Sequence, residues 1–239
     1  MFLSFGAIDE LAVLVRDAGA VLIAQVQTVH QAREALAQGA QVIVAQGGEA
    51  GGHGGVRGTL ALVPAIADAL GPGPVPIVAA GGIADGRGLA AALMLGASGV
   101  LCGTAFYAAV ESLAHAAAKE RLVQASGDHT VKSAVFDIAR GLPWPSGPWQ
   151  LRTLRNRFSD RWEHDLAGLQ GTLADAAGSY STAQTAGDFD HAAVIAGEAA
   201  DMVTAVAPAA QIVQRMVDQC DALLRSAGAG LPNPATPRH

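Results

Sequence analysis

The stretch QVIVAQGGEAGGHGGVRG, residues 41–58, decides how the rest of the sequence is interpreted. It opens with an apolar run at 42–45, which is typical of a strand buried on both faces of a parallel sheet. From Gln46 onward glycine dominates, and glycine lets the backbone approach a flat or anionic ligand without obstruction by a Cβ atom. His53 lies inside this glycine loop. The stretch therefore predicts a buried strand that ends in a ligand-binding loop.

Between residues 45 and 56 the ionisable side chains are Glu49 and His53, and they suggest different roles. A carboxylate accepts hydrogen bonds from backbone N–H groups, so we expect Glu49 to hold the turn. Histidine exchanges protons near neutral pH, so His53 is the candidate for catalysis. The other histidines lie in helical, mixed or terminal contexts that are typical of surface or core residues, at positions 30, 115, 129, 164, 191 and 239. No metal-ligand spacing and no nucleophile motif accompanies His53, so we expect neither a metal nor serine-hydrolase chemistry.

Apolar runs and helical patterns alternate over residues 1–110. Strands are predicted at 2–5, 21–26, 41–45, 75–79 and 98–101. Helices are predicted at 8–18, 29–38, 60–70 and 89–95, and Thr28 is suited to cap the second of them. Strands that alternate with helices through short turns predict a parallel α/β sheet with right-handed crossovers. Ligands of such folds bind at the carboxyl ends of the strands, where the glycine loops of this sequence lie.

Two further glycine loops follow the fourth and fifth predicted strands. One contains Ala80, Gly81 and Gly82, and the other contains Gly103 and Thr104. In barrel enzymes, loops after neighbouring strands commonly form a phosphate site. Because glycines recur at the ends of successive strands, phosphate binding is favoured over tight turns alone. The sequence has no Walker motif and no GxGxxG motif after its first strand, which disfavours a nucleoside triphosphate or a Rossmann dinucleotide.

The pattern changes after about residue 110. Helices are predicted at 113–124, 160–177, 191–206 and 208–226, around a Pro- and Trp-rich turn segment at 141–150. We therefore expect residues 111–226 to form a helical lobe that also supplies barrel-completing helices, and residues 227–239 to form a disordered tail. A basic cluster is interpreted as a solvated or interdomain face, because acidic residues follow it closely: Arg152, Arg155, Arg157 and Arg161.

The composition narrows the classes of partner. The 239 residues carry a net charge of −6 and include 51% hydrophobic residues, which argues against a nucleic acid as partner. No apolar run reaches the roughly 20 residues that a transmembrane helix needs, so no membrane partner is expected. Cys102 and Cys220 lie too far apart in sequence to suggest a disulfide or metal motif. The first residues lack the features of a signal peptide, so we expect a cytoplasmic protein.

Three parts of the sequence resemble the nitronate monooxygenases, formerly called 2-nitropropane dioxygenases. They are AQGGEAGGHGG at 45–55, PIVAAGGIADGRGLAAALMLGASGVLCGTAF at 76–106, and the pair RGLPWP and LRNRF at 140–145 and 154–158. The resemblance covers residues 2–224, and its first two motifs are specific to this superfamily. It implies an FMN-dependent TIM-type (β/α)8 barrel that oxidises alkyl nitronates or nitroalkanes with O₂ to carbonyl compounds and nitrite.

The same resemblance implies roles for individual residues. The phosphate of FMN would lie on Ala80, Gly81, Gly82, Gly103 and Thr104. The flavin ring would meet Gln46, Gly47, Gly51 and Gly52. His53 would face the substrate, either as the base or as the hydrogen-bonding group that orients the nitro oxygens.

The sequence departs from the family in its number of strands. Five are predicted, whereas a closed barrel needs eight, and family members carry three more βα units before the strand at residue 2. We therefore expect residues 1–110 to be the C-terminal five units of a barrel. A start site assigned too late, a fragment of a broken gene, and a half-barrel completed by another chain or a homo-oligomer would each explain this. Ala105 also departs, because many relatives have an arginine after Gly-Thr.

Two alternatives to a nitronate monooxygenase stay open. Flavin-dependent enoyl-ACP reductases share the EAGGH and AAGGIADGRG motifs but use NAD(P)H, so the reductant separates the two activities. An inactive truncated remnant would retain FMN weakly and show no turnover.

Overall fold

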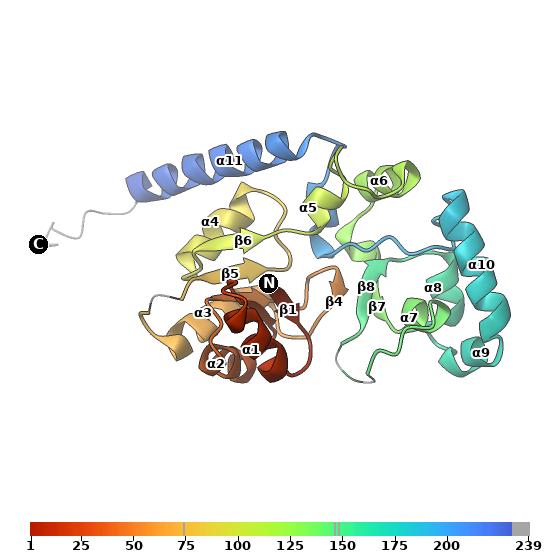
Figure 1. Cartoon of the computed structure of the whole chain (residues 1–239). Coiled ribbons are helices and arrows are strands. Elements are labelled where there is room, and N and C mark those ends of the chain that lie inside the picture. The colour runs from red at the N-terminus through yellow and green to blue at the C-terminus, as the bar shows by residue number, and fades with distance from the viewer. Residues whose placement is uncertain (74, 146, 148, 231–239) are drawn as a thin grey trace, which may run out of the picture.

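Five parallel strands form the main sheet of the chain, whose computed structural model describes residues 1–230 except 74, 146 and 148. The strands lie in the order β1-β2-β3-β5-β6 (Figure 1). Their bounds are β1 Phe2–Ser4, β2 Ile23–Val26, β3 Val42–Gln46, β5 Ile77–Ala80 and β6 Gly99–Leu101. Every predicted strand is therefore confirmed, to within two residues of its expected bounds.

The register of this sheet brings the glycine loops together at the carboxyl ends of the strands. Gln46 at the end of β3 pairs with Ala80 at the end of β5, and Ala80 pairs with Leu101 at the end of β6. Because parallel strands share one direction, the loops that follow these residues leave the sheet side by side. The strand ends thus bring together loop residues that lie as far apart in the sequence as positions 46 and 104.

Four helices connect these strands, as the sequence predicts: α1 Asp9–Asp17, α2 Val29–Ala37, α3 Thr59–Leu70 and α4 Gly86–Met94. The Oγ1 atom of Thr28 accepts a hydrogen bond from the N–H of Gln31 at 3.1 Å, which confirms the expected cap of α2. Helix α3 packs on α2, β3 and β5, and the core between them buries Ile43, Leu62 and Ile66 completely.

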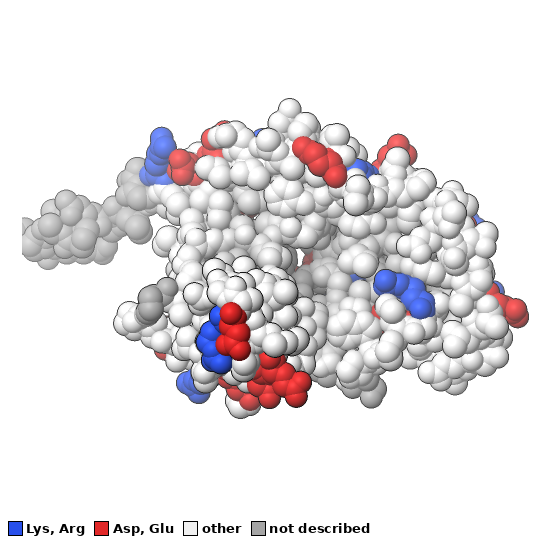
Figure 2. All heavy atoms as spheres, viewed as in Figure 1, with Lys and Arg blue, Asp and Glu red and all other residues white. Residues whose placement is uncertain are grey.

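Strands β1 and β6 are the edges of the sheet within the part of the chain that the structure describes. Large apolar side chains are exposed near both edges, including Phe2, Leu14 and Leu101. Figure 2 shows one face of the molecule, on which charged residues are few and scattered. No helix among the described residues is both long and apolar enough to cross a membrane.

A second sheet corrects the expectation that residues 111–226 are helical. It is antiparallel, with the order β4-β8-β7, and consists of β4 Gly52–His53, β8 Leu151–Leu154 and β7 Thr130–Ser133. Strand β4 belongs to the glycine loop, whereas β7 and β8 belong to the lobe. The loop that carries His53 is thus joined to the lobe by strand pairing.

The helices of the lobe are shorter and more numerous than predicted: α5 Thr104–Tyr107, α6 Ala116–Val123, α7 Val135–Ala139, α8 Arg157–Trp162, α9 Leu166–Gly171 and α10 Leu173–Ala186, with a 3-10 turn η1 at Gly127–His129. The single helix predicted at 160–177 is wrong, because polar side chains start new helices within and before it. Asn156 and Ser159 form a capping box for α8, and Asp165 caps α9.

The helix predicted at 191–206 is also wrong. This segment is irregular apart from a short 3-10 helix, η2 Glu198–Met202. Its backbone groups bond to distant residues: the N–H of Gly197 donates to Thr104 Oγ1, and the N–H of Glu198 donates to the carbonyl of Glu49. These long-range bonds replace the local ones that a helix requires.

The last helix, α11 Ala209–Gly230, returns to the main sheet and lies along α4 (Figure 1). It extends past the predicted end at 226, so residues 227–230 are helical instead of belonging to a disordered tail. Residues 231–239 of that expected tail lie outside the described residues.

Gly86→Ala is expected to destabilise the fold by about 1–3 kcal/mol through overpacking. A Cβ atom at Gly86 would lie 2.5 Å from both the Met216 carbonyl oxygen and the Cys220 nitrogen of α11. Gly178→Ala is the matched control, since Gly178 is an exposed position of α10 with open space around it. Chemical denaturation should show a gain of about 0.5–1 kcal/mol for the control. Equal shifts of the same sign would contradict the close α4–α11 contact.

Candidate active site

A cavity of about 250 Å³ lies at the carboxyl ends of the parallel strands. Seven of the nine predicted cofactor residues line it: Gln46, Gly51, Ala80, Gly81, Gly82, Gly103 and Thr104. Gly47, Gly52 and the predicted catalytic residue His53 do not line it. Small-molecule sites usually span about 300–1,000 Å³, so this cavity is large enough to hold only part of a flavin cofactor.

The cavity offers backbone donors that suit a phosphate. Within the described chain no hydrogen bond engages the N–H groups of Gly82, Gly103 or Thr104. Gly81 and Gly82 have φ angles of +103° and +68°, which glycine adopts without strain. A Cβ atom at Gly103 would meet nothing within 4 Å, so space is left beside this N–H group. Unpaired donors beside open space fit an anionic group such as the phosphate of FMN.

Three of the predicted cofactor glycines are required by the protein's own packing, and one of them is Gly81, where a Cβ atom would lie 2.9 Å from the Gly47 carbonyl oxygen. A Cβ atom at Gly47 would collide with the Thr59 hydroxyl, and one at Gly51 would lie 2.5 Å from the Ala196 carbonyl carbon. Glycine at these positions is therefore explained without a ligand. The glycines of the loop after β3 are thus needed for packing, whereas Gly103 in the loop after β6 leaves open space.

Glu49 holds the turn, as predicted from the sequence. Both of its carboxylate oxygens lie 2.9 Å from the backbone nitrogen of Thr59, and the Thr59 hydroxyl donates to Oε2 at 2.9 Å. Because Thr59 is the first residue of α3, these bonds fasten the glycine loop to the start of that helix.

The irregular segment at 192–197 closes one side of the cavity, and sequence reasoning missed it. Ile195 and Ala199 line the cavity. The Oγ1 atom of Thr104 accepts from the N–H of Gly197 at 2.9 Å, so this oxygen is already engaged. Gly197 in the middle of the predicted helix was the available signal, because glycine disfavours a helix interior.

His53 points away from the cavity toward the lobe. Its Nε2 atom lies 2.8 Å from Oδ2 of Asp137 on α7, and the side chains are only 11% and 5% exposed, respectively. Its backbone carbonyl accepts from Gln46 Nε2 at 3.0 Å, and Gln27 Nε2 in turn donates to Gln46 Oε1 at 2.8 Å. His53 is therefore one side chain away from the cavity, through Gln46.

Two aromatic rings, those of Trp144 and Phe5, lie against the imidazole of His53, and the ring of Trp149 packs on Phe5. Trp144 stacks on the imidazole with ring centroids 3.6 Å apart and an interplanar angle of 21°. Phe5 packs edge-on against the rings of Trp144 and Trp149, at centroid distances of 5.1 and 5.5 Å. Phe5 has a φ of 62°, a strained conformation found in no other non-glycine residue among those described. The tryptophans come from the predicted turn segment at 141–150, whose contribution to the site was missed.

Comparison with known proteins decides the family. A family model described as nitronate monooxygenase matches residues 3–219. The chain belongs to the nitronate monooxygenase family. It is 41% identical to nitronate monooxygenase npaC of Metarhizium robertsii over 219 residues, which cover 87% of this chain and 60% of the relative. It is 38% identical to a nitronate monooxygenase of Pseudomonas aeruginosa over 206 residues, which cover 80% and 54%.

Solved structures resemble this family member over nearly its whole length. FabK from Thermotoga maritima superposes with a TM-score of 0.82 and 29% identity, covering 96% of this chain and 70% of its own. Nitroalkane oxidase from Streptomyces ansochromogenes gives a TM-score of 0.75 and 30% identity, covering 95% and 65%. The α/β fold with a parallel sheet is thus shared, and the chain spans only part of each relative.

Two basic side chains of the lobe hold the glycine loop of this nitronate monooxygenase family member. Arg152 donates to the Gly48 carbonyl at 3.0 Å and pairs with Glu198 at 2.8 Å. Lys132 donates to the carbonyl of Gly55, and burial, followed by the charge of Arg152, lowers the pKa of Lys132. Arg152 is mostly buried and joins the lobe to the glycine loop, which agrees with the interdomain alternative for the basic cluster and excludes the solvated one for this residue.

Other candidate groups contribute no reactive atom. Burial raises the pKa of the Cys102 thiol to about 11, so it remains protonated at neutral pH and is not a nucleophile. Among the described residues, no group of three or more His, Cys, Asp or Glu side chains is placed to hold a metal ion.

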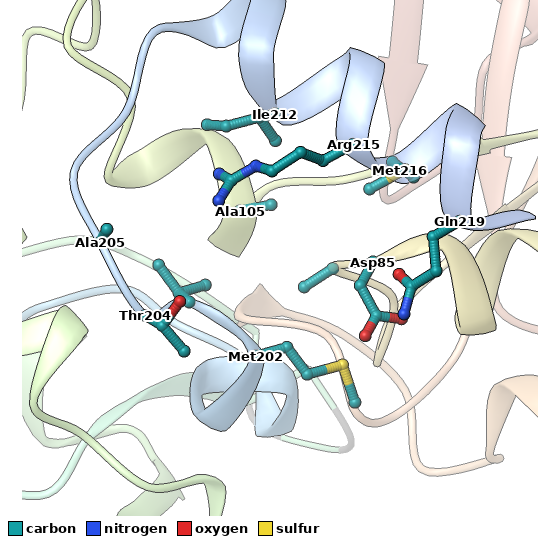
Figure 3. A pocket seen from close by; sticks show the side chains of 11 residues that line it. Asp85, Ala105, Met202, Thr204, Ala205, Ile212, Arg215, Met216 and Gln219 are labelled. Carbon is teal, nitrogen blue, oxygen red and sulfur yellow. The ribbon is translucent and has the colours of Figure 1, made fainter.

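A second cavity, of about 170 Å³, lies where α11 meets the start of α4 and the residue after Thr104 (Figure 3). Figure 3 shows the Arg215 side chain beside Ala105, with Asp85 and Gln219 at the other end. The oxygen Oε1 of Gln219 accepts from the N–H of Gly86 at 2.8 Å, and Asp85 caps α4. These contacts fasten α11 to the turn that follows β5 and so position the loop of the family motif.

Proposed function

We propose that this chain forms the FMN-binding part of a nitronate monooxygenase that oxidises alkyl nitronates and nitroalkanes with O₂ to carbonyl compounds and nitrite. The observation that carries the proposal is the cavity at the strand ends, which gathers seven residues of the family motifs in a member of that family. We further propose that its five strands are five of the eight units of a (β/α)8 barrel in a cytoplasmic enzyme.

The residues around the cavity suit FMN in a defined orientation. The N–H groups of Gly82, Gly103 and Thr104 would bind its phosphate, and Gln46 and Gly51 would lie against its ring. When bound, FMN would accept electrons from the substrate and pass them to O₂. The protein must then position the substrate, exclude water and supply a proton acceptor.

His53 is the group that would supply this proton acceptor, or would hold the nitro oxygens by a hydrogen bond. The two roles differ in their substrate dependence. A neutral nitroalkane must lose the proton from its nitro-bearing carbon, whereas a nitronate has already lost it. A base is therefore needed for the first substrate and not for the second.

The strand edges at β1 and β6 would pair with three more βα units to close the barrel. A second copy of the chain or a separate chain could supply them. The proposed cavity would then be completed by those units, which agrees with its small volume in the described residues.

The alternative activity is that of the flavin-dependent enoyl-ACP reductases, which share the EAGGH and AAGGIADGRG motifs. The likeness to FabK from Thermotoga maritima favours keeping it as the second candidate. Both activities would use the same phosphate loops, so the choice between them depends on the electron donor.

The test is the visible absorbance spectrum of the purified chain after FMN addition and gel filtration. We expect a retained flavin spectrum that is bleached anaerobically by a nitronate and restored by O₂. Bleaching by NAD(P)H and not by nitronate would favour the enoyl reductase. A protein that retains no FMN and shows no turnover would contradict the proposal and support an inactive remnant.

A further inference from the structure

The pair formed by His53 and Asp137 has the geometry of a catalytic unit. The residues lie 84 positions apart in the sequence, on β4 and α7, and their side chains meet at 2.8 Å in a mostly buried setting. An ionised carboxylate can only accept hydrogen bonds, so the proton of this bond belongs to Nε2 of His53. Within the described chain, the Nδ1 atom has no hydrogen-bond partner. Nδ1 is therefore the nitrogen left free to take a proton.

The second carboxylate oxygen of Asp137, Oδ1, supports a role for this side chain that is tied to His53. Oδ1 is buried and has no hydrogen-bond partner among the described residues. A buried polar atom without a partner is costly, and a side chain retained solely for stability would ordinarily avoid it. The charge of Asp137 also acts on Tyr180 of α10. Burial, with a smaller contribution from Asp137, raises the pKa of the Tyr180 hydroxyl, which therefore stays neutral. His53 is thus the side chain that forms a direct hydrogen bond with Asp137.

The stacked indole acts in the same direction. Trp144 covers one face of the imidazole at 3.6 Å, and the face of an aromatic ring attracts a cation. A carboxylate at Nε2 and an indole over the ring would both stabilise the imidazolium that forms when Nδ1 accepts a proton. The surroundings of His53 are therefore better suited to a base than to a neutral hydrogen-bond donor.

We infer that Asp137 is a positioning residue that fixes the Nε2–H tautomer of His53, so that Nδ1 removes the α-proton of a nitroalkane. In this step the C–H bond at the nitro-bearing carbon breaks and an N–H bond forms at Nδ1. The electron pair of the C–H bond moves into the C=N bond of the nitronate. This inference rests on the proposed function and assigns His53 the role of base.

The isosteric substitution Asp137→Asn tests the inference by activity. The asparagine amide can donate a hydrogen bond to Nε2 and so favours the wrong tautomer, with Nδ1 protonated. We expect nitroalkane turnover by the FMN-loaded enzyme to fall at least about tenfold, with a much smaller loss for the preformed nitronate. The double variant with His53→Gln should lose no more nitroalkane turnover than His53→Gln alone, because the two residues act as a unit.

The matched control is Asp188→Asn, which breaks a second His–Asp pair. Asp188 and His191 lie 2.7 Å apart, but both are exposed and outside the site. We expect no change in either activity for this variant. Equal losses on nitroalkane and nitronate in Asp137→Asn, or additive losses in the double variant, would overturn the inference.

A measurement without turnover separates this inference from the proposed function. In ¹⁵N-histidine-labelled protein the His53 signal, assigned by its loss in His53→Gln, should report Nε2–H and a bare Nδ1. Asp137→Asn should shift this signal toward the Nδ1–H form, and Asp188→Asn should leave it unchanged. A wild-type Nδ1–H signal would refute the role of Asp137 even if nitronates are oxidised. If the chain shows the expected tautomer but no activity on nitronates, the proposed function is contradicted and the role of Asp137 is not.

Discussion

Replacing His53 with glutamine is expected to lower nitroalkane oxidation by about 10²–10⁴-fold, the usual contribution of a general base. Glutamine keeps a polar end of similar reach but cannot take up a proton. FMN should still bind, because the His53 side chain does not line the cavity whose loops would hold the phosphate. Steady-state assays with a nitroalkane and with its nitronate, together with FMN titration, measure the three quantities separately.

The pattern of losses in His53→Gln distinguishes the two roles proposed for this residue. A large loss on the nitroalkane with a small loss on the nitronate indicates a base. Similar losses on both substrates indicate a group that orients the nitro oxygens. The control is His30→Asn, because His30 is exposed on α2 and, among the described residues, pairs with Glu34 of the same helix alone. Full activity on both substrates in His53→Gln would exclude both roles.

Gly103→Val is expected to weaken FMN binding by about 10²–10⁴-fold, equivalent to losing two hydrogen bonds to a charged group at about 1.5–3 kcal/mol each. The new side chain would fill the open space beside the free N–H groups of Gly103 and Thr104. The backbone of Gly103 has a φ of −94°, which valine also adopts, so the fold should survive. Fluorescence titration with FMN and thermal unfolding of the apoprotein check the two expectations.

Gly99→Val is the matched control for Gly103→Val. A Cβ atom at Gly99 also meets nothing within 4 Å, but Gly99 lies in β6 and does not line the cavity. Valine suits a strand, so this variant should fold and bind FMN normally. An unchanged FMN affinity in Gly103→Val would contradict the assignment of the phosphate to this loop. Gly81 would be a poorer test, since a Cβ atom there would lie 2.9 Å from the Gly47 carbonyl oxygen and strain the fold itself.

Local sequence signals predicted the main sheet well. Thr28 caps its helix by accepting a hydrogen bond from a residue three positions away, and the apolar run at 42–45 forms the buried strand β3. Glu49 was assigned to the turn because a carboxylate accepts hydrogen bonds from backbone N–H groups, and it accepts one from Thr59. In each case the interaction that decides the structure lies within a short stretch of sequence.

The remaining features depend on contacts between distant residues. Strand β8 pairs with β4 of the glycine loop, so its formation depends on a partner about a hundred positions away. The segment at 191–206 has helical spacing, but its backbone donors bond to Glu49 and Thr104. The contact of Asp137 with His53 leaves no periodic signal in the sequence. Patterns of neighbouring residues cannot reveal such pairings.

The position of His53 on β4 has a mechanical consequence for the proposed reaction. Its ladder partner β8 and its carboxylate partner both belong to the lobe, whereas most residues around the cavity belong to the loops of the parallel sheet. His53 itself leaves the sheet in the same glycine loop as Gln46 and Gly51, and contacts from the lobe hold its side chain. Substitutions in these lobe contacts are therefore expected to change the proposed turnover more than the proposed cofactor affinity, because they move the His53 side chain and leave the strand ends in place.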